Sequence, residues 1–437
     1  MELLARLEEY FEFKSLGTDW RTETLAGLTT FVTMAYIIFV NPAILAETGM
    51  NGAAVTMATC LGAGFGSILM GAWARYPIAL APGMGLNAYF TYVVVKGMGV
   101  PWQAALGAVF LSGVAFLLLT MTGLRQKIVE SLPPALYSAV AVGIGLFIAF
   151  IGFKNAGIVV ADPATTVTLG NLRAPMTALA CAGLLATAAL MAWGVKAAML
   201  LGILGTTVLG ALLGLVQWRW TTPDLSAIGA TAFQLDIAKV LEIGLIEIVF
   251  VFLFVDLFDN LGTLVAVSKK AGLLDSSHRI PRVGRILTCD SLATMFGGLM
   301  GTSTVVSYIE SASGVAAGGR SGITAIVAGL LFLAATFVAP LFGVIPAAAT
   351  APALVLVGSL MISHSAEIDW RDPEAAIPSF LTITTIPLSF SIANGLAIGF
   401  LAYTLLKVLR GKAGQVGWLV YVLSILFLTR FIYLGKG

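Results

Sequence analysis

The sequence predicts an all-α polytopic membrane protein with fourteen transmembrane segments, and three observations lead to this fold class. Hydrophobic residues make up 59% of the 437 residues and charged residues 11%, and the mean hydropathy is +0.97. These values lie far from the averages of soluble domains. Apolar runs long enough to cross a bilayer, about 20 residues each, recur along the chain, and the polar stretch 218–236 divides them into two sets of seven. The net charge of +2 is too small to indicate nucleic-acid binding.

The first set of spans follows a short N-terminal segment, residues 1–22, in which acidic and apolar residues alternate. This segment lacks the basic start, apolar centre and small-residue cleavage site of a signal peptide, so we expect it to remain as a cytosolic lead-in. Seven apolar runs then predict spans at 23–45, 53–73, 77–96, 99–123, 134–153, 175–195 and 197–216.

The second set of spans begins after the polar stretch. Its apolar runs predict spans at 241–266, 286–301, 303–318, 321–343, 347–363, 376–390 and 392–409. The stretch from 376 to 409 could be one long kinked helix or two short helices broken near 392–394. The cations Lys407, Arg410 and Lys412 favour two, because two crossings return them to the cytosol. The final apolar run, 417–434, is either a fifteenth span or a helix in the membrane interface, and we favour the interfacial helix.

Basic residues in the loops set the predicted orientation. By the positive-inside rule, the loop richest in lysine and arginine lies in the cytoplasm. That loop contains Lys269, Lys270, Arg279, Arg282 and Arg285. Counting spans back from it places the N-terminus in the cytoplasm, and the short loops of the chain suit a bacterial inner membrane.

The third and tenth spans are interrupted by residues that break helices. Because seven is an odd number of crossings, the two sets predict an inverted repeat, and substrate sites in such repeats lie near the midplane at broken spans. In the third span Gly85 and Asn87 follow the run YPIALAPG, and in the tenth Glu310 follows GTSTVVSYI. Backbone that is not helical inside a membrane must be buried in protein or line a cavity. The breaks therefore predict a polar pocket, with short extended strands at 79–82 and 302–306.

Asp256 and Asp259 lie in the eighth span, in the run VFLFVDLFDNLGTLVAV, which contains no basic residue. A carboxylate at the centre of a bilayer costs roughly 2.5 to 3.5 kcal/mol on insertion scales, so intramembrane acids usually face a bundle interior or a substrate path. Together with Glu310, these two acids favour a transporter. Two structural alternatives stay open. One is an ion pair between Glu310 and Arg320. These residues would lie roughly 15 Å apart along a continuous helix, so they could pair only if the helix breaks at Gly318 and Gly319. The other is close packing of small residues at the breaks.

The sequence does not favour an enzyme or a metal protein. Asp256 and Asp259 form a DxxD motif like that of membrane prenyl-transferring enzymes, but those enzymes need a second acid-rich motif to hold magnesium on a diphosphate. The other intramembrane acids, Asp290 and Glu310, lie singly in the sequence. The cysteines and histidines show no metal-ligand spacing, so we expect neither a metal nor a cofactor. These residues are Cys60, Cys181, Cys289, His278 and His364.

Five long motifs occur in a fixed order along the chain. They are AGLTTFVTMAYIIFVNP, YPIALAPGMGLNAYF, FVDLFDNLGTL, GTSTVVSYIESASGVAAGGRSG and ATAPALVLVG. With these motifs the chain resembles, over nearly its whole length, the azaguanine-type purine permeases, which carry adenine, guanine and hypoxanthine within the nucleobase permease (nucleobase-ascorbate transporter) superfamily. The resemblance implies a core domain and a gate domain. The core would comprise residues 23–123 (spans 1–4) and 241–343 (spans 8–11), and the gate residues 134–216 (spans 5–7) and 347–409 (spans 12–14).

The resemblance also implies which residues bind the substrate. Carried over position by position, the binding residues of the family fall on Asn87, Asp256, Asp259 and Glu310. Gly85, in the same break as Asn87, is added to the predicted substrate site. A purine edge alternates N–H donors with nitrogen and carbonyl acceptors, so carboxylates can accept from it while an asparagine both donates and accepts. The chain departs from the family motif DLFDTxGTL at Asn260, where threonine is expected.

The same acids suggest how transport is driven. A carboxylate in a desolvated pocket can take up a proton on one side of the membrane and release it on the other. We therefore expect purine import by proton symport, with Asp259 or Asp256 carrying the proton and Glu310 holding the base. The resemblance implies an elevator-like motion of the core against the gate, and a homodimer follows only by analogy. The alternative is an inorganic-anion transporter of related fold, although three acids would repel an anion.

Overall fold

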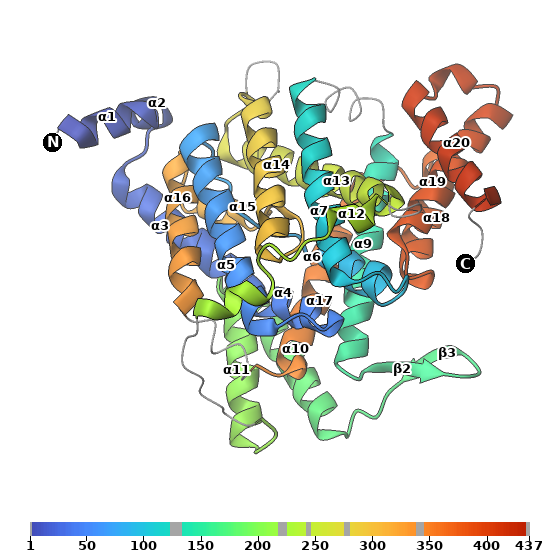
Figure 1. The fold of residues 1–437 in the computed structure, drawn as a ribbon, viewed down its shortest axis with the longest axis horizontal. Coiled ribbons are helices and arrows are strands. Elements are labelled where there is room, and N and C mark those ends of the chain that lie inside the picture. The colour runs from blue at the N-terminus through green and yellow to red at the C-terminus, as the bar shows by residue number, and fades with distance from the viewer. Residues whose placement is uncertain are drawn as a thin grey trace. The chain divides into compact units, whose positions relative to one another are not determined.

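The chain is almost entirely helical. The computed structural model describes residues 2–122, 133–216, 225–241, 246–274, 280–337 and 345–433 (Figure 1). The chain forms two compact units, and each unit combines segments from both halves of the sequence. The first unit comprises Met1–Leu118 and Lys154–Ala353, and the second comprises Leu119–Phe153 and Leu354–Gly437. The predicted assignment of spans to a core and a gate domain stays a prediction.

The first unit begins with the elements of the first four predicted spans. Span 1 follows α1 (Glu2–Tyr10) and α2 (Phe13–Leu16) and contains α3 (Trp20–Met34), α4 (Ile37–Leu45) and the 3₁₀ turn η1 (Ala46–Thr48). Span 2 contains α5 (Gly52–Leu69) and the π-helix η2 (Met70–Ala74). Span 3 is divided into β1 (Leu80–Pro82), α6 (Met84–Ala88) and the π-helix η3 (Tyr89–Val95), and α7 (Trp102–Met121) follows.

The rest of the first unit comes from the middle of the chain. A hairpin of β2 (Val159–Asp162) and β3 (Thr166–Leu169) precedes α10 (Pro175–Ala192), α11 (Ala198–Leu212), the 3₁₀ helix η4 (Leu225–Ala230) and α12 (Ile237–Val240). Spans 8 to 11 contribute α13 (Ile246–Ala271), α14 (Val283–Met300), β4 (Val305–Ser307), α15 (Ser311–Ala316) and α16 (Gly322–Ala335). Helix α17 (Ala347–Met361) begins in this unit and ends in the second.

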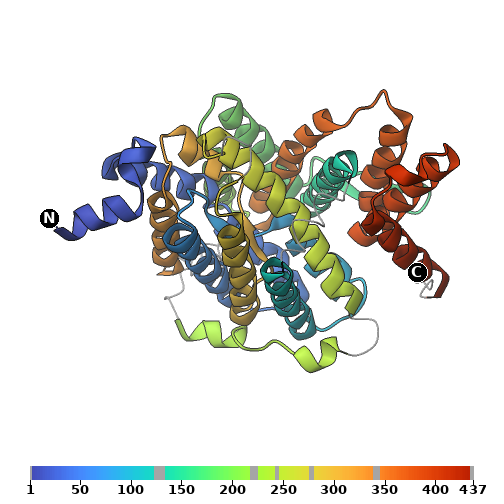
Figure 2. The same ribbon diagram turned by 90° about the horizontal axis from the view of Figure 1, so that it is seen from above.

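The second unit contains most of α9 (Pro134–Asn155) and the C-terminal helices. The latter are η6 (Ile362–Glu367), α18 (Pro373–Leu388), α19 (Ile392–Leu409), η7 (Ala413–Gln415) and α20 (Trp418–Tyr433). Helix α19 packs against both α18 and α20, and the three lie side by side in Figures 1 and 2. At the start of α18, Lys407 and Lys412 donate to the carboxylate of Glu374 and hold the pKa of this carboxyl at about 2.

Polar residues just before the helices explain where several of them begin. A side-chain oxygen at this position accepts a hydrogen bond from a backbone N–H of the first turn. Asp19 accepts from the N–H of Thr22 at the start of α3, at 2.8 Å. The same kind of hydrogen bond is accepted at the starts of α5, α16 and α19 by the side chains of Asn51, Ser321 and Ser391. The starts of these helices are therefore indicated by single polar residues in the sequence, whereas the breaks inside the spans are caused by proline and glycine.

Glycines allow α5, η2 and α16 to approach closely. A Cβ atom at Gly71 would lie 2.3 Å from the carbonyl oxygen of Gly322, and a Cβ at Gly322 would lie 2.0 Å from the carbonyl oxygen of Gly71. Both distances are shorter than van der Waals contact, so only glycine fits at either position. Helix α16 also packs against α3, which brings spans 1, 2 and 11 together in the first unit.

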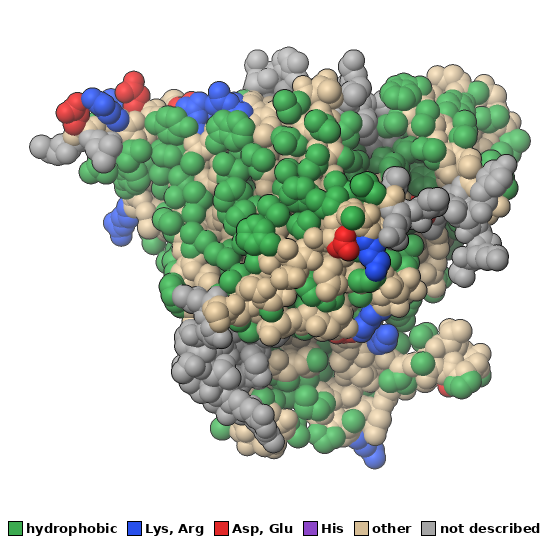
Figure 3. Space-filling model, viewed as in Figure 1, with side chains coloured by type: hydrophobic (Ala, Val, Ile, Leu, Met, Phe, Trp, Pro, Cys, Tyr) green, Lys and Arg blue, Asp and Glu red, His purple; other side chains and the backbone are tan. Residues whose placement is uncertain are grey.

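The membrane character predicted from the sequence is confirmed. Among the described residues, eight helices are long and apolar enough to cross a membrane. They are Trp20–Thr48, Gly52–Ala74, Trp102–Met121, Pro134–Asn155, Pro175–Ala192, Glu247–Ala271, Ala347–Glu367 and Ile392–Leu409. Hydrophobic side chains cover most of the face over α5, α14 and α16, with few charged groups among them (Figure 3). The count of fourteen spans and the inverted repeat stay predictions, because spans 3 and 10 are broken and other apolar helices are short.

Candidate functional site

Two short strands mark the centre of the candidate site. Strands β1 and β4 are antiparallel, with Leu80 opposite Ser307 and Pro82 opposite Val305. The predicted strands in spans 3 and 10 are therefore present, and β4 begins three residues later than the predicted start at 302. The ladder is extended by the N–H of Gly83, which donates to the carbonyl of Thr304 at 2.9 Å. Each strand leads into a short helix, so the two halves of the sequence meet where both spans are broken.

Asn87 lies in α6, immediately after β1, and is fully buried. Its Oδ1 accepts a hydrogen bond from the hydroxyl of Ser303, which lies just before β4 in the other half of the sequence. Its amide nitrogen lies 4.0 Å from the sulfur of Met84. Gly85 is also buried in α6, two residues before Asn87. The structure thus places both predicted residues of span 3 beside the β1–β4 strand pair, which we call the strand crossing because the two halves of the sequence meet there.

Glu310 lies between β4 and α15, and its Oε1 accepts a hydrogen bond from the hydroxyl of Tyr36 at 2.7 Å. Tyr36 is buried between α3 and α4 in span 1. The predicted alternative, a pair between Glu310 and Arg320, is not formed among the described residues. The guanidinium of Arg320 instead donates to the backbone carbonyls of Val315 and Gly319, at 2.6 and 2.7 Å. Glu310 is therefore not used as a structural partner of that arginine.

Asp256 is fully buried in α13, and the residues on either side of it show which way it faces. Residues four apart lie on one face of a helix, with a drift of about 40° per step. Four residues earlier, Phe252 packs edge-to-face on Tyr89 with ring centroids 5.1 Å apart. Eight residues later, Leu264 belongs to an apolar cluster that includes Leu80, Val305 and Val315. Asp256 lies between these contacts, on the face that α13 turns toward α6, β4 and α15.

The predicted site residues therefore converge in part. Asn87, Asp256 and Glu310 come from α6, α13 and the start of α15, and α13 packs against α6, β4 and α15. The side chain of Asp259 lies outside the described residues, so its proposed role stays a prediction. Among the described residues, no group of three or more His, Cys, Asp or Glu side chains could hold a metal ion. The arrangement offers an amide and carboxyl groups, which suit a ligand that both donates and accepts hydrogen bonds.

Sequence reasoning missed Tyr36 and Ser303 as partners of the site residues. Tyr36 stands inside the apolar run VTMAYIIFV, and Ser303 stands among several small hydroxyl residues. Neither position differs from its neighbours by charge. A sequence signal for them would have been a polar side chain within the motifs of the first and tenth spans. Several such side chains are present there, and only the fold shows which two contact the site residues.

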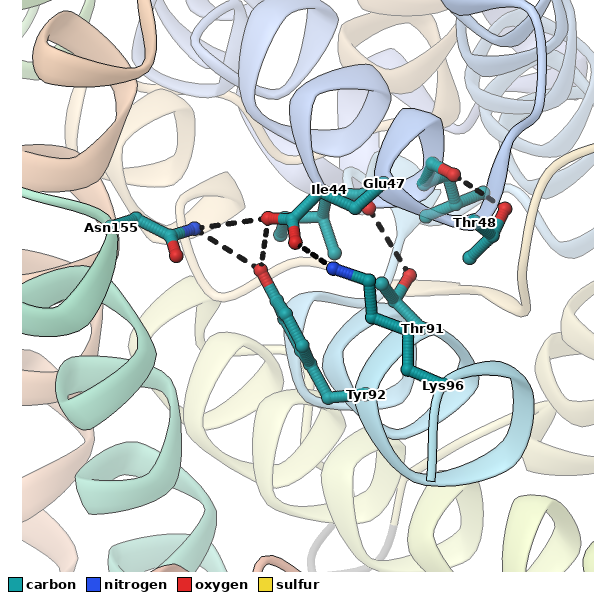
Figure 4. Close-up of polar contacts among 8 residues, drawn as sticks. Ile44, Glu47, Thr48, Thr91, Tyr92, Lys96 and Asn155 are labelled. Atoms are coloured by element: carbon teal, nitrogen blue, oxygen red, sulfur yellow. Dashed lines mark hydrogen bonds and ion pairs between the residues drawn. The ribbon is translucent and has the colours of Figure 1, made fainter. Parts of the chain in front are cut away.

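A second polar cluster joins the ends of spans 1 and 3 and the last residue of α9. Figure 4 shows the Glu47 carboxylate between Tyr92, Lys96 and Asn155. The Tyr92 hydroxyl and the Lys96 ammonium donate to this carboxylate. The amide of Asn155 donates to Glu47 at 3.2 Å and to the Tyr92 hydroxyl at 3.1 Å. Because a hydrogen-bonded carboxylate at an element end fixes several segments together, we assign this cluster a structural role.

A buried acid in span 1 also has a structural role. Glu23 is fully buried and caps α16. Its carboxylate accepts from the hydroxyl of Thr324 at 2.6 Å and from the N–H groups of Arg320 and Ser321 at 2.9 and 3.1 Å. These contacts satisfy the N-terminus of a helix, and the hydroxyl of Thr18 also donates to the carboxylate, at 2.8 Å. Intramembrane acids in this chain therefore differ in role, and those at the strand crossing are the candidates for binding.

Comparison with known proteins identifies the family. A family model described as "Permease family" matches residues 21–422. The chain belongs to this permease family. The guanine/hypoxanthine permease PbuG of Bacillus subtilis (strain 168) is 46% identical, over 98% of this chain and 100% of its own. The adenine permease AdeP of Escherichia coli (strain K12) is 43% identical, over 98% of this chain and 96% of its own. The predicted resemblance to the nucleobase permeases is thereby confirmed.

Solved structures show the fold of the permease. The transmembrane domain of a cyanobacterium bicarbonate transporter, BicA, matches with a TM-score of 0.65 and 17% identity, over 86% of this chain and 96% of its own. SLC26A9 matches with a TM-score of 0.64 and 10% identity, over 94% of this chain and 69% of its own. At such identities the likeness concerns the fold alone. Because the named relatives are permeases, the chain is a transporter and not an enzyme.

Proposed function

We propose that this permease imports purine nucleobases together with protons, and that Asn87, Asp256 and Glu310 bind the base. The observation that carries the proposal is the meeting of both sequence halves at β1 and β4, where α13 packs against α6 and α15. The adenine and guanine/hypoxanthine permeases, 43% and 46% identical, support purines as the substrate class.

The chemistry of the three side chains suits a flat base with alternating donors and acceptors. In this proposal the carboxylate of Glu310, oriented by the Tyr36 hydroxyl, accepts from N–H groups of the base. Asn87 donates and accepts at a second edge, and Gly85 lets the base approach the backbone of α6. Apolar side chains near the crossing would cover the ring faces.

Proton coupling is assigned to the acids of α13. Asp256 is fully buried, and a buried carboxylate favours its neutral form, so proton binding and release can follow access to either side. Asp259 is proposed as the second candidate proton carrier. The proposal includes alternating access by an elevator-like shift of the core spans 1–4 and 8–11 against the gate spans, in a bacterial inner membrane with the N-terminus in the cytoplasm.

An inorganic anion is the alternative substrate class. Its support is the fold shared with a bicarbonate transporter, and fold alone does not determine substrate. At the crossing the carboxylate of Glu310, and that of Asp256 whenever it is ionised, would repel an anion. A nucleobase, which is neutral, meets no such barrier.

Uptake measurements test the proposal. Radiolabelled adenine, guanine, hypoxanthine, uracil and bicarbonate are supplied to cells that lack their own purine uptake, with and without a protonophore. We expect saturable uptake of at least one purine, abolished by the protonophore. Glu310→Gln and Asp256→Asn should each lower kcat/KM at least about tenfold, equivalent to about 1.4 kcal/mol.

The matched control is Asp162→Asn, which neutralises a partly exposed acid in the β2–β3 hairpin. This variant should transport like the native chain. Absence of purine uptake by native protein that is correctly inserted would overturn the substrate class. Native rates in Glu310→Gln and Asp256→Asn would overturn the site.

A further inference from the structure

Asn260 is a buried polar residue to which the proposed mechanism gives no role. It lies in α13, one helical turn after Asp256, and is fully buried. Neither its Nδ2 nor its Oδ1 has a hydrogen-bond partner among the described residues. Burying an amide without partners is unfavourable, and native proteins rarely keep such groups without a reason.

The position of Asn260 on α13 shows what it faces. It lies on the same face as Asp256 and Leu264, four residues from each, because residues i and i+4 of a helix share a face. Leu264 belongs to an apolar cluster whose members include Leu80 of β1 and Val305 of β4, and α13 packs against β4 and α15. Asn260 is therefore bracketed by the proposed site acid on one side and by the strand crossing on the other.

Other unused polar groups lie on the element that α13 contacts there. Helix α13 packs against β4. The Thr304 hydroxyl, just before β4, and the Ser307 hydroxyl, at its end, are buried and lack hydrogen-bond partners among the residues that the structure describes. Hydrogen-bonding capacity is thus left unused on both sides of the contact between α13 and β4. Such capacity is typical of a place where a polar ligand binds.

We propose that Asn260 is a further substrate-contacting residue, and that it hydrogen-bonds to an edge of the base at which a donor lies next to an acceptor. This inference rests on the proposed function, because it assumes a nucleobase at the crossing. An asparagine amide can donate through Nδ2 and accept through Oδ1 at the same time, and rotation by 180° exchanges the two. It therefore matches an N–H beside a carbonyl, as in hypoxanthine and guanine, and an amino group beside a ring nitrogen, as in adenine.

A binding role and a purely structural role for Asn260 predict different effects of its replacement on stability. If the amide held the fold together, its removal would destabilise the protein. Since the amide makes no hydrogen bond within the described chain, replacing it by an apolar group of similar size should leave the free energy of unfolding unchanged or raise it. Substrate affinity and stability therefore separate the two roles.

The test uses purified full-length protein in detergent, with Tm and the Kd for adenine, guanine and hypoxanthine measured for each variant. Asn260→Leu should keep or raise the Tm without ligand and weaken purine binding at least tenfold. Asn260→Ala, which introduces no steric conflict, is the second variant and should weaken binding to the same degree. The matched control is Asn41→Leu, because the Asn41 amide donates to Thr59 and Thr302. This control should lower the Tm.

The outcomes separate this inference from the function on which it rests. If the native protein binds purines and both Asn260 variants bind them with native Kd, the inference is overturned and the proposed function stands. A lowered Tm with native Kd would make Asn260 structural and also overturn it. If the folded native protein binds no purine, the proposed function and this inference fail together.

Discussion

The hydrogen bond from Tyr36 to Glu310 links the first span to the broken tenth span across 274 positions of sequence. It fixes one carboxylate oxygen of Glu310, at 2.7 Å. Tyr36→Phe keeps the ring and removes only the donor. Hydrogen bonds to charged groups contribute about 1.5 to 3 kcal/mol, so we expect kcat/KM for purine uptake to fall roughly tenfold to a hundredfold.

Two companion variants sharpen this prediction. Tyr10→Phe removes a hydroxyl that donates to the backbone of Ala72, remote from the crossing, and should leave uptake unchanged. In a Glu310→Ala background, which removes the acceptor, Tyr36→Phe should add little, because the two residues act as a pair. Fully additive losses in the double variant would show that Tyr36 acts independently of Glu310.

At the scale of the elements, the close approach of η2 and α16 depends on a pair of glycines. Gly322→Ala places a Cβ 2.0 Å from the carbonyl oxygen of Gly71, which is backbone and cannot move aside cheaply. Overpacking of this kind typically costs about 1 to 3 kcal/mol, so we expect a lower Tm in detergent. Gly205→Ala is the control, since a Cβ at Gly205 in α11 meets no atom within 4 Å. The control should keep or raise the Tm because alanine favours helix. An equal drop in both variants would contradict the packing explanation.

The breaks in the spans were predictable from the sequence because proline and glycine act locally. Proline cannot donate a backbone hydrogen bond and disfavours helix in the residue before it, which is why strand β1 at Leu80–Pro82 could be expected. The partner of that strand was harder to fix. The run Thr302–Val306 suits an extended strand, yet β4 is Val305–Ser307, because its register is set by pairing with β1 rather than by propensity.

Contacts between distant side chains were not predictable in the same way. Glu310 was recognised because an acid in a membrane span is rare, but its partner Tyr36 is one aromatic residue in an apolar run and carries no charge. Glu23 was not recognised at all, since it is the first residue of the predicted span 23–45, where a charged residue at the membrane boundary is unremarkable, although it is fully buried as the cap of α16. Charge in an apolar run identifies a site, whereas the partner of that charge is determined by the tertiary fold.

At the scale of the whole chain, the count of crossings determines on which side the C-terminus lies. Helix α20 packs along α19, and its other side exposes large apolar residues, including Trp418 at 63% and Ile425 at 63%. Such a surface suits a helix lying in the membrane interface as well as one that crosses it. With fourteen spans and an interfacial α20, both termini lie in the cytoplasm, and Lys407, Arg410 and Lys412 obey the positive-inside rule.

Reporter fusions test this topology directly. Green fluorescent protein and alkaline phosphatase are fused in turn after Lys412 and after Gly437, because the first fluoresces only in the cytoplasm and the second is active only outside it. We expect fluorescence and no phosphatase activity at both positions. Phosphatase activity after Gly437 with fluorescence after Lys412 would make α20 a fifteenth span. Phosphatase activity without fluorescence after Lys412 would contradict the fourteen-span count, since an odd number of crossings would then precede the basic cluster.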